Sequence, residues 1–265
     1  MSQPAGHKIW DPVHYLKYAD QRLRPALDLL ARVPLDRAER ITDLGCGPGT
    51  VAPHLAQAFP DAEITGVDSS GVMLDAARAA YGASATWTQA DAATWQPDAP
   101  QDLIYANAAL QWLDDHLTLF PRLFGFLKPG GVLAVQMPNQ YNNPSHVLMR
   151  EVAENGPWAD TLAPLLRPAP VARPEDYVAW LSPKAATVDV WQTEYCQVMT
   201  GEDPVLDWIG STALKPLCEA LALANDQRTA FLETLGNALR NAYPRHPDGT
   251  TLFPFRRLFI VAVKA

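Results

Sequence analysis

The sequence predicts an α/β protein built on a doubly wound, mostly parallel β-sheet. Short apolar runs alternate with amphipathic runs between residues 40 and 138, which is the pattern of a parallel sheet covered by helices on both faces. A glycine-rich turn directly follows the first apolar run. After residue 144 the pattern changes, and proline-rich and helical stretches separate two further strand-like runs. The parallel core is therefore expected to end near residue 138.

The elements of this core are expected in a regular order. Residues 12–32 have leucines at helical spacing, and Pro25 predicts a break or restart within that helical region. Serines typical of a helix N-cap open the run at 69–81. Strands are expected at 40–44, 63–68, 85–91, 102–110 and 132–138, and helices at 50–59, 69–81 and 116–131.

The remainder of the chain is expected to add an edge to the sheet and a helical lid. A helix is predicted at 144–156, a proline-rich surface segment at 157–174, a strand at 186–199, helices within 203–242 and a final strand at 256–265. The two late strands are expected to form an antiparallel pair at one sheet edge. We interpret residues 1–265 as a single domain.

Composition and charge exclude several classes of protein. The chain has 265 residues, 21 Lys and Arg against 29 Asp and Glu, and a formal net charge of −8, which disfavours a nucleic-acid partner. No apolar run has the length of a membrane helix, and the start of the chain lacks the apolar segment of an export signal. Three scattered cysteines (Cys46, Cys196, Cys218) suit neither a disulfide framework nor a metal site. A cytoplasmic protein without membrane partner is expected.

The glycine-rich turn, Asp43-Leu44-Gly45-Cys46-Gly47-Pro48-Gly49-Thr50, is the sharpest local signal. Its G-x-G-x-G spacing disfavours a dinucleotide fingerprint, and it lacks the Gly-Lys-Ser/Thr of a P-loop. Asp43, Asp68 and Asp91 end three successive predicted strands, so they share the rim where open parallel sheets bind ligands. Between Asp43 and Asp115 there are ten acids and one base, which suits a cationic ligand, although a solvated acidic surface explains the charge alone. A nucleoside carrying an amino acid and no phosphates fits this rim, and S-adenosylmethionine is such a molecule.

This constellation resembles the class I S-adenosylmethionine-dependent methyltransferases. The matching segments are ITDLGCGPGT, ITGVDSS, QADAATW, DLIYANAALQWL and LKPGGVLAVQMP, within residues 40–138. The resemblance implies a Rossmann-like, seven-stranded sheet, with 40–138 as the cofactor-binding core, 12–32 as an N-terminal lid, and 144–182 and 200–250 as substrate-side insertions. It implies that the glycine loop and Asn107 hold the methionine portion, Asp68 the ribose, and Met73, Asp91 and Ala92 the adenine. The full cofactor-binding set is Tyr15, Asp43, Gly45, Cys46, Gly47, Asp68, Ser69, Met73, Asp91, Ala92 and Asn107.

A closer resemblance is to the trans-aconitate 2-methyltransferase family. It rests on YLKYADQRLRPALDLLARVP, ANAALQWLDDH, PGGVLAVQMPNQ, PSHVLMREVA, VDVWQTEY and FRRLFIVA. It implies a carboxyl O-methyltransferase for a small polycarboxylic acid. The alternatives are a methyltransferase for a carrier-protein-linked malonyl group or another small nucleophile, a non-catalytic binder of S-adenosylmethionine, and a disfavoured NAD-dependent dehydrogenase.

The implied substrate determines which side chains the chemistry requires. A carboxylate nucleophile is already ionised at neutral pH, so no catalytic base is predicted. Arginines suit the acid's carboxylates, and the candidates are Arg150, Arg173, Arg256 and Arg257. The resemblance favours Arg150 and Arg257 as substrate-binding residues, with Trp112 as a wall of the pocket. A monomer is the favoured oligomeric state.

Overall fold

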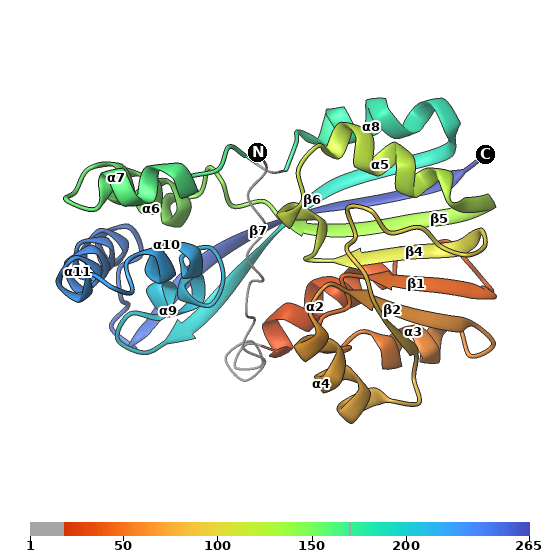
Figure 1. Cartoon of the computed structure of the whole chain (residues 1–265), viewed down its shortest axis with the longest axis horizontal. Helices are drawn as coiled ribbons and strands as arrows, with labels where there is room; N and C mark the ends of the chain where they lie inside the picture. Colours follow the sequence, from red (N-terminus) through yellow and green to blue (C-terminus); the bar gives the residue numbers. More distant parts are fainter. Residues whose placement is uncertain (1–18, 170) are drawn as a thin grey trace. The chain divides into compact units, whose positions relative to one another are not determined.

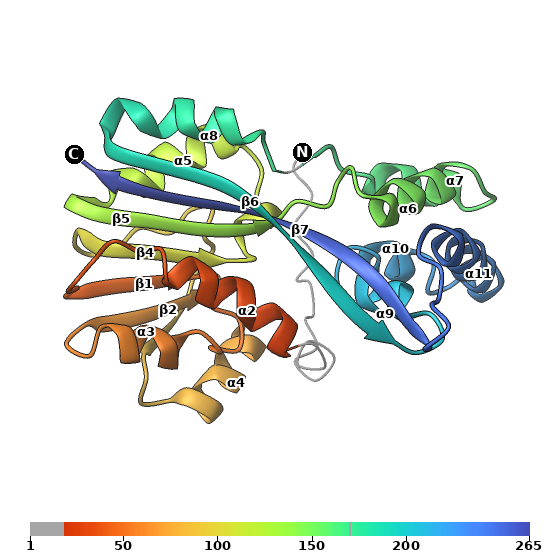
Figure 2. The ribbon, with the colours of Figure 1, turned by 180° about the vertical axis from the view of Figure 1, so that it is seen from behind.

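Seven strands form one sheet in the order β3–β2–β1–β4–β5–β7–β6 (Figure 1). A computed structural model describes residues 19–169 and 171–265 of the chain. The pairings from β3 to β5 are parallel, whereas β7 runs opposite to β5 and β6 (Figures 1 and 2). The predicted α/β class, with a mostly parallel sheet and an antiparallel pair at one edge, is confirmed. The strands are β1 (Arg40–Leu44), β2 (Glu63–Asp68), β3 (Thr86–Gln89), β4 (Gln101–Asn107), β5 (Leu127–Pro138), β6 (Ala185–Thr200) and β7 (Thr250–Lys264).

The helices fall largely where the sequence predicts them. They are α2 (Ala19–Leu30), α3 (Ala52–Ala58), α4 (Gly71–Tyr81), α5 (His116–Gly125), α6 (Pro144–Glu154), α7 (Ala159–Leu162), α8 (Pro174–Leu181), α9 (Pro204–Gly210), α10 (Lys215–Ala220) and α11 (Asn225–Ala242). Three short 3₁₀ segments are η1 (Leu110–Trp112), η2 (Ala163–Leu165) and η3 (Ser182–Lys184). The predicted serine cap of α4 is present, because the Ser70 side chain accepts a hydrogen bond from the Met73 amide.

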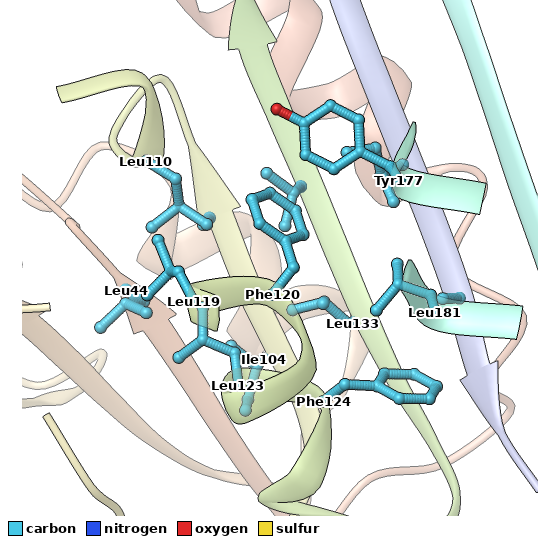
Figure 3. Packing of buried hydrophobic residues seen from close by; sticks show 14 of the residues in the cluster. Leu44, Ile104, Leu110, Leu119, Phe120, Leu123, Phe124, Leu133, Tyr177 and Leu181 are labelled. Carbon is cyan, nitrogen blue, oxygen red and sulfur yellow. The ribbon is translucent and has the colours of Figure 1, made fainter. Parts of the chain in front are cut away.

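Side chains of β4 show that the sheet is covered on both faces. Successive side chains of a strand point to opposite faces. The Tyr105 hydroxyl donates a 2.6 Å hydrogen bond to the Ala26 carbonyl of α2. The neighbouring Ile104 belongs instead to a buried cluster with Phe120 of α5 and Tyr177 of α8 (Figure 3). Helices α2 and α5 therefore cover opposite faces, as a doubly wound fold requires.

Helix α2 corrects the expectation of a break at Pro25. The helix runs without interruption from Ala19 to Leu30 and contains Pro25. A proline removes one hydrogen bond of the helix, but Ala26 and Leu29 are fully buried, and tertiary packing outweighs such local costs. The rest of the predicted lid, before residue 19, lies outside the described residues.

The stretch 127–131 corrects a second expectation, because it belongs to β5 and not to the preceding helix. Helix α5 ends at Gly125, and Leu127 already pairs with Gln101 of β4. The Gln101 amide also donates to the Phe126 carbonyl at 2.9 Å. Pairing with a distant strand therefore decides the conformation of this segment.

Two compact units divide the chain. Unit 1 consists of the described chain up to Pro138, Val171–Thr193 and Leu258–Ala265; unit 2 consists of Asn139–Pro170 and Glu194–Arg257. Strands β6 and β7 contribute residues to both units. Unit 2 has aromatic edge-to-face contacts of its own, among them Trp208 with Phe255 at 5.5 Å and Tyr243 with Phe253 at 5.3 Å between ring centroids. The interpretation as a single domain stays a prediction.

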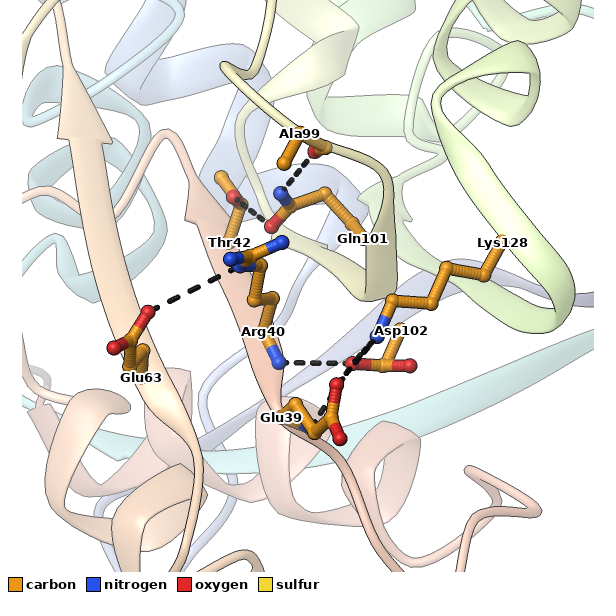
Figure 4. A network of polar contacts seen from close by, with 8 residues as sticks. All are labelled: Glu39, Arg40, Thr42, Glu63, Ala99, Gln101, Asp102 and Lys128. Atoms are coloured by element: carbon orange, nitrogen blue, oxygen red, sulfur yellow. Dashed lines mark hydrogen bonds and ion pairs between the residues drawn. The ribbon is translucent and has the colours of Figure 1, made fainter.

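A polar network ties the amino-terminal ends of three parallel strands together (Figure 4). The Asp102 carboxylate accepts the amide hydrogens of Glu39 and Arg40, both at 2.9 Å, and pairs with the Lys128 ammonium at 3.0 Å. These contacts lower the pKa of Asp102 although burial opposes them. Within residues 19–169 and 171–265, no helix has the length and apolar character needed to cross a membrane.

Candidate active site

The glycine loop between β1 and α3 depends on glycine at three positions. Gly45, Gly47 and Gly49 have φ angles of 78°, 55° and 79°, a region that side chains disfavour. A Cβ atom on Gly45 would lie 2.2 Å from the Ala109 Cβ, and one on Gly49 would lie 2.6 Å from the Trp87 ring. A Cβ on Gly47 would meet nothing within 4 Å in the described chain. The loop is thus packed on two sides and open at Gly47.

Asp68 at the end of β2 holds this loop in place. Its Oδ2 atom accepts the Gly47 amide hydrogen at 2.8 Å, and its Oδ1 atom accepts the Ser70 amide hydrogen at 2.9 Å. Burial raises the pKa of Asp68, and these backbone donors oppose the rise. The sequence signalled Asp68 as a ribose-binding residue but not as a partner of the loop.

Asp43 at the end of β1 is a buried acid with an unused acceptor. Its side chain is 2% exposed, and its Oδ2 atom has no hydrogen-bond partner among the described residues. Burial, with a smaller contribution from Asp68, raises its pKa to about 7. An unpartnered acceptor in a buried position is costly unless a donor reaches it. This carboxylate is therefore suited to a cationic ligand group.

Cys46 lies between these acids, inside the loop. Its thiol is buried and donates to the Gly47 carbonyl at 3.7 Å. Burial, Asp43 and Asp68 all raise its pKa, so a reactive thiolate is disfavoured. The residue packs within the loop.

The end of β4 presents a second buried acceptor beside a strained turn. The Asn107 Oδ1 atom is buried and has no partner in the part of the chain that the structure describes. Ala108 has a φ of 53°, which is unusual for alanine. The Ala108 amide donates to the Gln136 carbonyl at 2.9 Å, and the Gln111 side-chain amide donates to the Ala108 carbonyl at 2.7 Å. Sequence reasoning missed Ala108 and Gln111, because nothing local marks the turn.

Asp91 and Ala92 follow β3 at the same rim. The register pairs Asp68 with Gln89, so Asp91 lies two residues beyond the strand pair. Asp91 is exposed and Ala92 half-buried. The Asp91 Oδ1 atom accepts the Ala93 amide hydrogen at 2.9 Å. In the described chain, the Ala92 amide hydrogen has no partner.

Other predicted residues of unit 1 lie on the elements that flank this rim. Met73 is buried on α4, and Ser69, which is exposed, has a carbonyl that accepts from the Gln89 side chain at 3.0 Å. Trp112 is half-buried in η1. Tyr15 lies outside the described residues. Unit 1 thus brings the ends of β1, β2, β3 and β4 together around the point where the strand order reverses, which is where such sheets bind ligands.

Unit 2 contains the two favoured arginines. The Arg150 guanidinium carbon lies 3.8 Å from the centroid of the Tyr141 ring, a cation–π contact. His146, one helical turn before Arg150, has its pKa lowered to about 4 by burial and by the Arg150 charge. Its Nδ1 atom lies 3.1 Å from the Ser145 hydroxyl. The structure describes no acid paired with Arg150 in this part of the chain. His146 lies on α6 with Arg150, whereas Tyr141 lies in the turn before that helix. Sequence reasoning assigned no role to either residue.

The other three candidate arginines differ in their surroundings. Arg257 is 3% exposed, and its guanidinium carbon lies 4.5 Å from the centroid of the Phe255 ring. Arg173 pairs with Asp176 at 2.9 Å and with Glu175 at 3.2 Å. Arg256 pairs with Glu194 at 3.4 Å. Internal carboxylates therefore already neutralise Arg173 and Arg256.

Comparison with known sequences gives a consistent result. A family model described as "Methyltransferase domain" matches residues 41–131. The trans-aconitate 2-methyltransferase of Azoarcus sp. (strain BH72) is 49% identical over 255 residues, which cover 96% of this chain and 99% of the relative. The trans-aconitate 2-methyltransferase of Methylobacterium radiotolerans is 48% identical over 259 residues, which cover 97% of this chain and 98% of the relative.

Comparison with solved structures supports the fold. Phosphoethanolamine N-methyltransferase 2 of Haemonchus contortus, solved with phosphomonomethylethanolamine and S-adenosylhomocysteine, aligns with a TM-score of 0.55 at 19% identity, over 91% of this chain and 52% of the other. The YcgJ protein of Bacillus subtilis aligns with a TM-score of 0.55 at 19% identity, over 91% of this chain and 98% of the other. At these identities, the likeness concerns the fold alone.

Proposed function

Because the chain belongs to the trans-aconitate 2-methyltransferase family, we propose that it transfers the methyl group of S-adenosylmethionine to a carboxylate of trans-aconitate. The products are the methyl ester and S-adenosylhomocysteine. The observation that carries this proposal is the identity of 49% over almost the full length of both chains. Similarity of that extent includes the segments outside the methyltransferase domain at 41–131, where an acceptor is expected to be selected. No observation favours the carrier-protein alternative.

The donor set of unit 1 fits S-adenosylmethionine. The ligand's ammonium group supplies donors for the buried acceptors Asp43 Oδ2 and Asn107 Oδ1. The ribose hydroxyls suit Asp68. The adenine amino group suits the Asp91 carboxylate, and adenine N1 suits the Ala92 amide hydrogen. A cofactor with phosphates would instead meet acids at this rim, and Coulomb repulsion disfavours it.

Methyl transfer from S-adenosylmethionine to a carboxylate requires the protein to align the two molecules but not to move a proton. S-adenosylmethionine supplies a sulfonium-bound methyl group that a carboxylate oxygen can attack directly. The residues of this chain have to bind and orient the two molecules and exclude water. Since the acceptor is ionised at neutral pH, no side chain has to remove a proton. We accordingly assign no general base.

The acceptor carries several negative charges and requires cations. We propose that Arg150 and Arg257 bind its carboxylates and that Trp112 forms an apolar wall for its carbon skeleton. The cation–π contact of Arg150 with Tyr141 orients the guanidinium without neutralising it. The expectations of a cytoplasmic monomer without a nucleic-acid partner stay predictions.

A substrate screen tests this proposal. The purified chain is incubated with methyl-labelled S-adenosylmethionine and, separately, trans-aconitate, cis-aconitate, citrate, isocitrate and a malonyl carrier protein. Labelled methyl ester from trans-aconitate, in excess over the other arms, is the expected result. Transfer to the malonyl carrier protein alone would replace the proposed acceptor. Absence of S-adenosylhomocysteine binding in calorimetry would remove the methyltransferase assignment itself.

A further inference from the structure

Arg122 of α5 connects three backbone carbonyls of the loop that follows β3. Its Nη1 atom donates to the Trp95 carbonyl at 2.6 Å, and its Nη2 atom donates to the carbonyls of Ala92 and Ala93, both at 2.9 Å. The guanidinium is half-buried, and its carbon lies 5.6 Å from the centroid of the Phe126 ring. The planar, five-donor head of arginine serves these three carbonyls from two nitrogens whose N–H groups have fixed directions, which a lysine ammonium cannot reproduce from its single nitrogen.

The same loop is fixed from its other side by Asp91. The Asp91 carbonyl accepts the amide hydrogens of Thr94 at 3.0 Å and Trp95 at 2.7 Å. A trans peptide group is planar, so its carbonyl and amide hydrogen point in opposite directions. The Ala92 amide hydrogen therefore points away from these bonds, and no described residue accepts it.

Arg122 completes the constraint at the next peptide group. It holds the Ala92 carbonyl, while the Ala93 amide hydrogen binds Asp91 Oδ1 at 2.9 Å. Both peptide groups that flank the Ala92 Cα are thus fixed. Trp95, which is 8% exposed and packs edge-to-face on Phe126 at 5.9 Å, anchors the end of the loop.

We propose that Arg122 is a positioning residue that determines nucleobase specificity, through its bonds to the carbonyls of Ala92, Ala93 and Trp95. It fixes the backbone that carries the Ala92 amide donor and the Asp91 carboxylate acceptor, so that the donor faces adenine N1 and the acceptor faces the adenine amino group. This inference rests on the proposed function, because it assumes that the loop binds the adenine of S-adenosylmethionine. Hypoxanthine reverses both groups, with a donor at N1 and an acceptor at position 6, so the fixed loop rejects it.

Calorimetric titration with S-adenosylhomocysteine and with S-inosylhomocysteine tests the inference without reference to turnover. The wild type is expected to prefer the adenine compound by about tenfold or more, the equivalent of one to two hydrogen bonds. In Arg122→Met, the affinity for S-adenosylhomocysteine falls by about tenfold, and the preference falls toward unity. Arg78→Met is the matched control, because Arg78 donates to the Trp87 carbonyl at 3.1 Å, outside this loop.

Two further variants distinguish the positioning of the loop by Arg122 from the effect of its positive charge and from its contribution to folding. Arg122→Lys keeps a positive charge near Asp91 but has a single nitrogen, so it should restore the preference only in part. In the Asp91→Asn background, Arg122→Met should change the preference much less than in the wild type. A lysine variant with the wild-type preference, or a folded methionine variant that merely melts earlier with unchanged affinities, would overturn the proposal. Failure of the wild type to bind S-adenosylhomocysteine would instead overturn the proposed function.

Discussion

At the residue scale, the buried carboxylate of Asp43 lowers the stability of the ligand-free protein but is suited to binding a ligand ammonium group. The folded protein raises its pKa from 3.8 to about 7 because the carboxyl is buried. Between those two pH values the folded state retains a proton that the unfolded chain has lost. Ionisation of Asp43 therefore makes the free energy of unfolding smaller as the pH rises through this window. A ligand ammonium would offset that cost.

Replacing Asp43 with asparagine should make the ligand-free protein more stable at pH 8, by on the order of a few kcal/mol. The gain in the free energy of unfolding should shrink toward pH 4.5, because Asp43 is then mostly protonated in the folded wild type and destabilises it little. Denaturant unfolding of both proteins at the two pH values measures this difference. A gain that does not depend on pH would contradict the assignment of the penalty to the Asp43 charge.

The same Asp43→Asn variant should bind S-adenosylhomocysteine more weakly, by about 1–3 kcal/mol, because a charge-assisted hydrogen bond becomes a neutral one. In the wild type, affinity should rise from pH 5.5 to 7.5 as Asp43 ionises. The variant should lose this rise. Calorimetry over that range provides the measurement, and an equal pH dependence in both proteins would exclude Asp43 as the ammonium partner.

Arg150 is proposed to bind the acceptor's carboxylates, and its guanidinium has a cation–π contact with Tyr141. Arg150→Met should raise the KM for trans-aconitate strongly, because loss of one partner of a charged pair typically costs about 2–5 kcal/mol. Its affinity for S-adenosylhomocysteine should not change. Arg173→Met is the matched control, since Arg173 is exposed and already paired with Asp176 and Glu175. Equal kinetics in both variants would place the acceptor's cation elsewhere.

At the element scale, two glycines of the loop between β1 and α3 are expected to have different roles: Gly45 in the packing of the fold and Gly47 in ligand binding. Gly45→Ala places a Cβ 2.2 Å from the Ala109 Cβ at a φ of 78°, so it should destabilise the fold by about 1–3 kcal/mol from the backbone conformation alone. Gly47→Ala meets no described atom within 4 Å, so its cost should come from its φ only.

The two alanine variants should therefore differ in their ligand response. Gly47→Ala points its methyl into the open side of the loop and should lose S-adenosylhomocysteine affinity with a smaller change in unfolding free energy than Gly45→Ala. Thermal melts with and without ligand measure both quantities. A Gly47→Ala protein that binds as tightly as the wild type would show that the ligand does not approach the loop at this residue.

The bounds of the helices and strands show which parts of the secondary structure the local sequence pattern predicts. Strands β1 and β2 coincide with the predicted ranges 40–44 and 63–68, because each is a short apolar run with a clear break at both ends. The prediction failed where a distant partner decides the conformation. Pro25 stays helical because α2 packs on the sheet, and Leu127 becomes strand because Gln101 pairs with it.

At the scale of the whole molecule, a carboxylate acceptor predicts the pH dependence of methyl transfer. With both substrates saturating, the single-turnover rate should be nearly flat between about pH 6 and 8.5, because a carboxylate with a pKa near 4 is ionised throughout. Rapid-quench measurements give the rate of the chemical step. A tenfold rise per pH unit would indicate an acceptor that must lose a proton, and the carboxyl assignment would then fail.

Local sequence by itself determined the alternation of strands and helices, the glycine turn and the acids at three strand ends, because these features depend on residues close together in the chain. Only the tertiary structure decided which polar groups remain without partners. Asp43 and Asn107 keep buried acceptors without partners among the described residues, whereas carboxylates neutralise the positive charges of Arg173 and Arg256. The bonds from Arg122 to the loop after β3 likewise join residues about 30 positions apart. Burial and pairing arise from contacts between distant segments, and such contacts leave no periodic signature in the sequence.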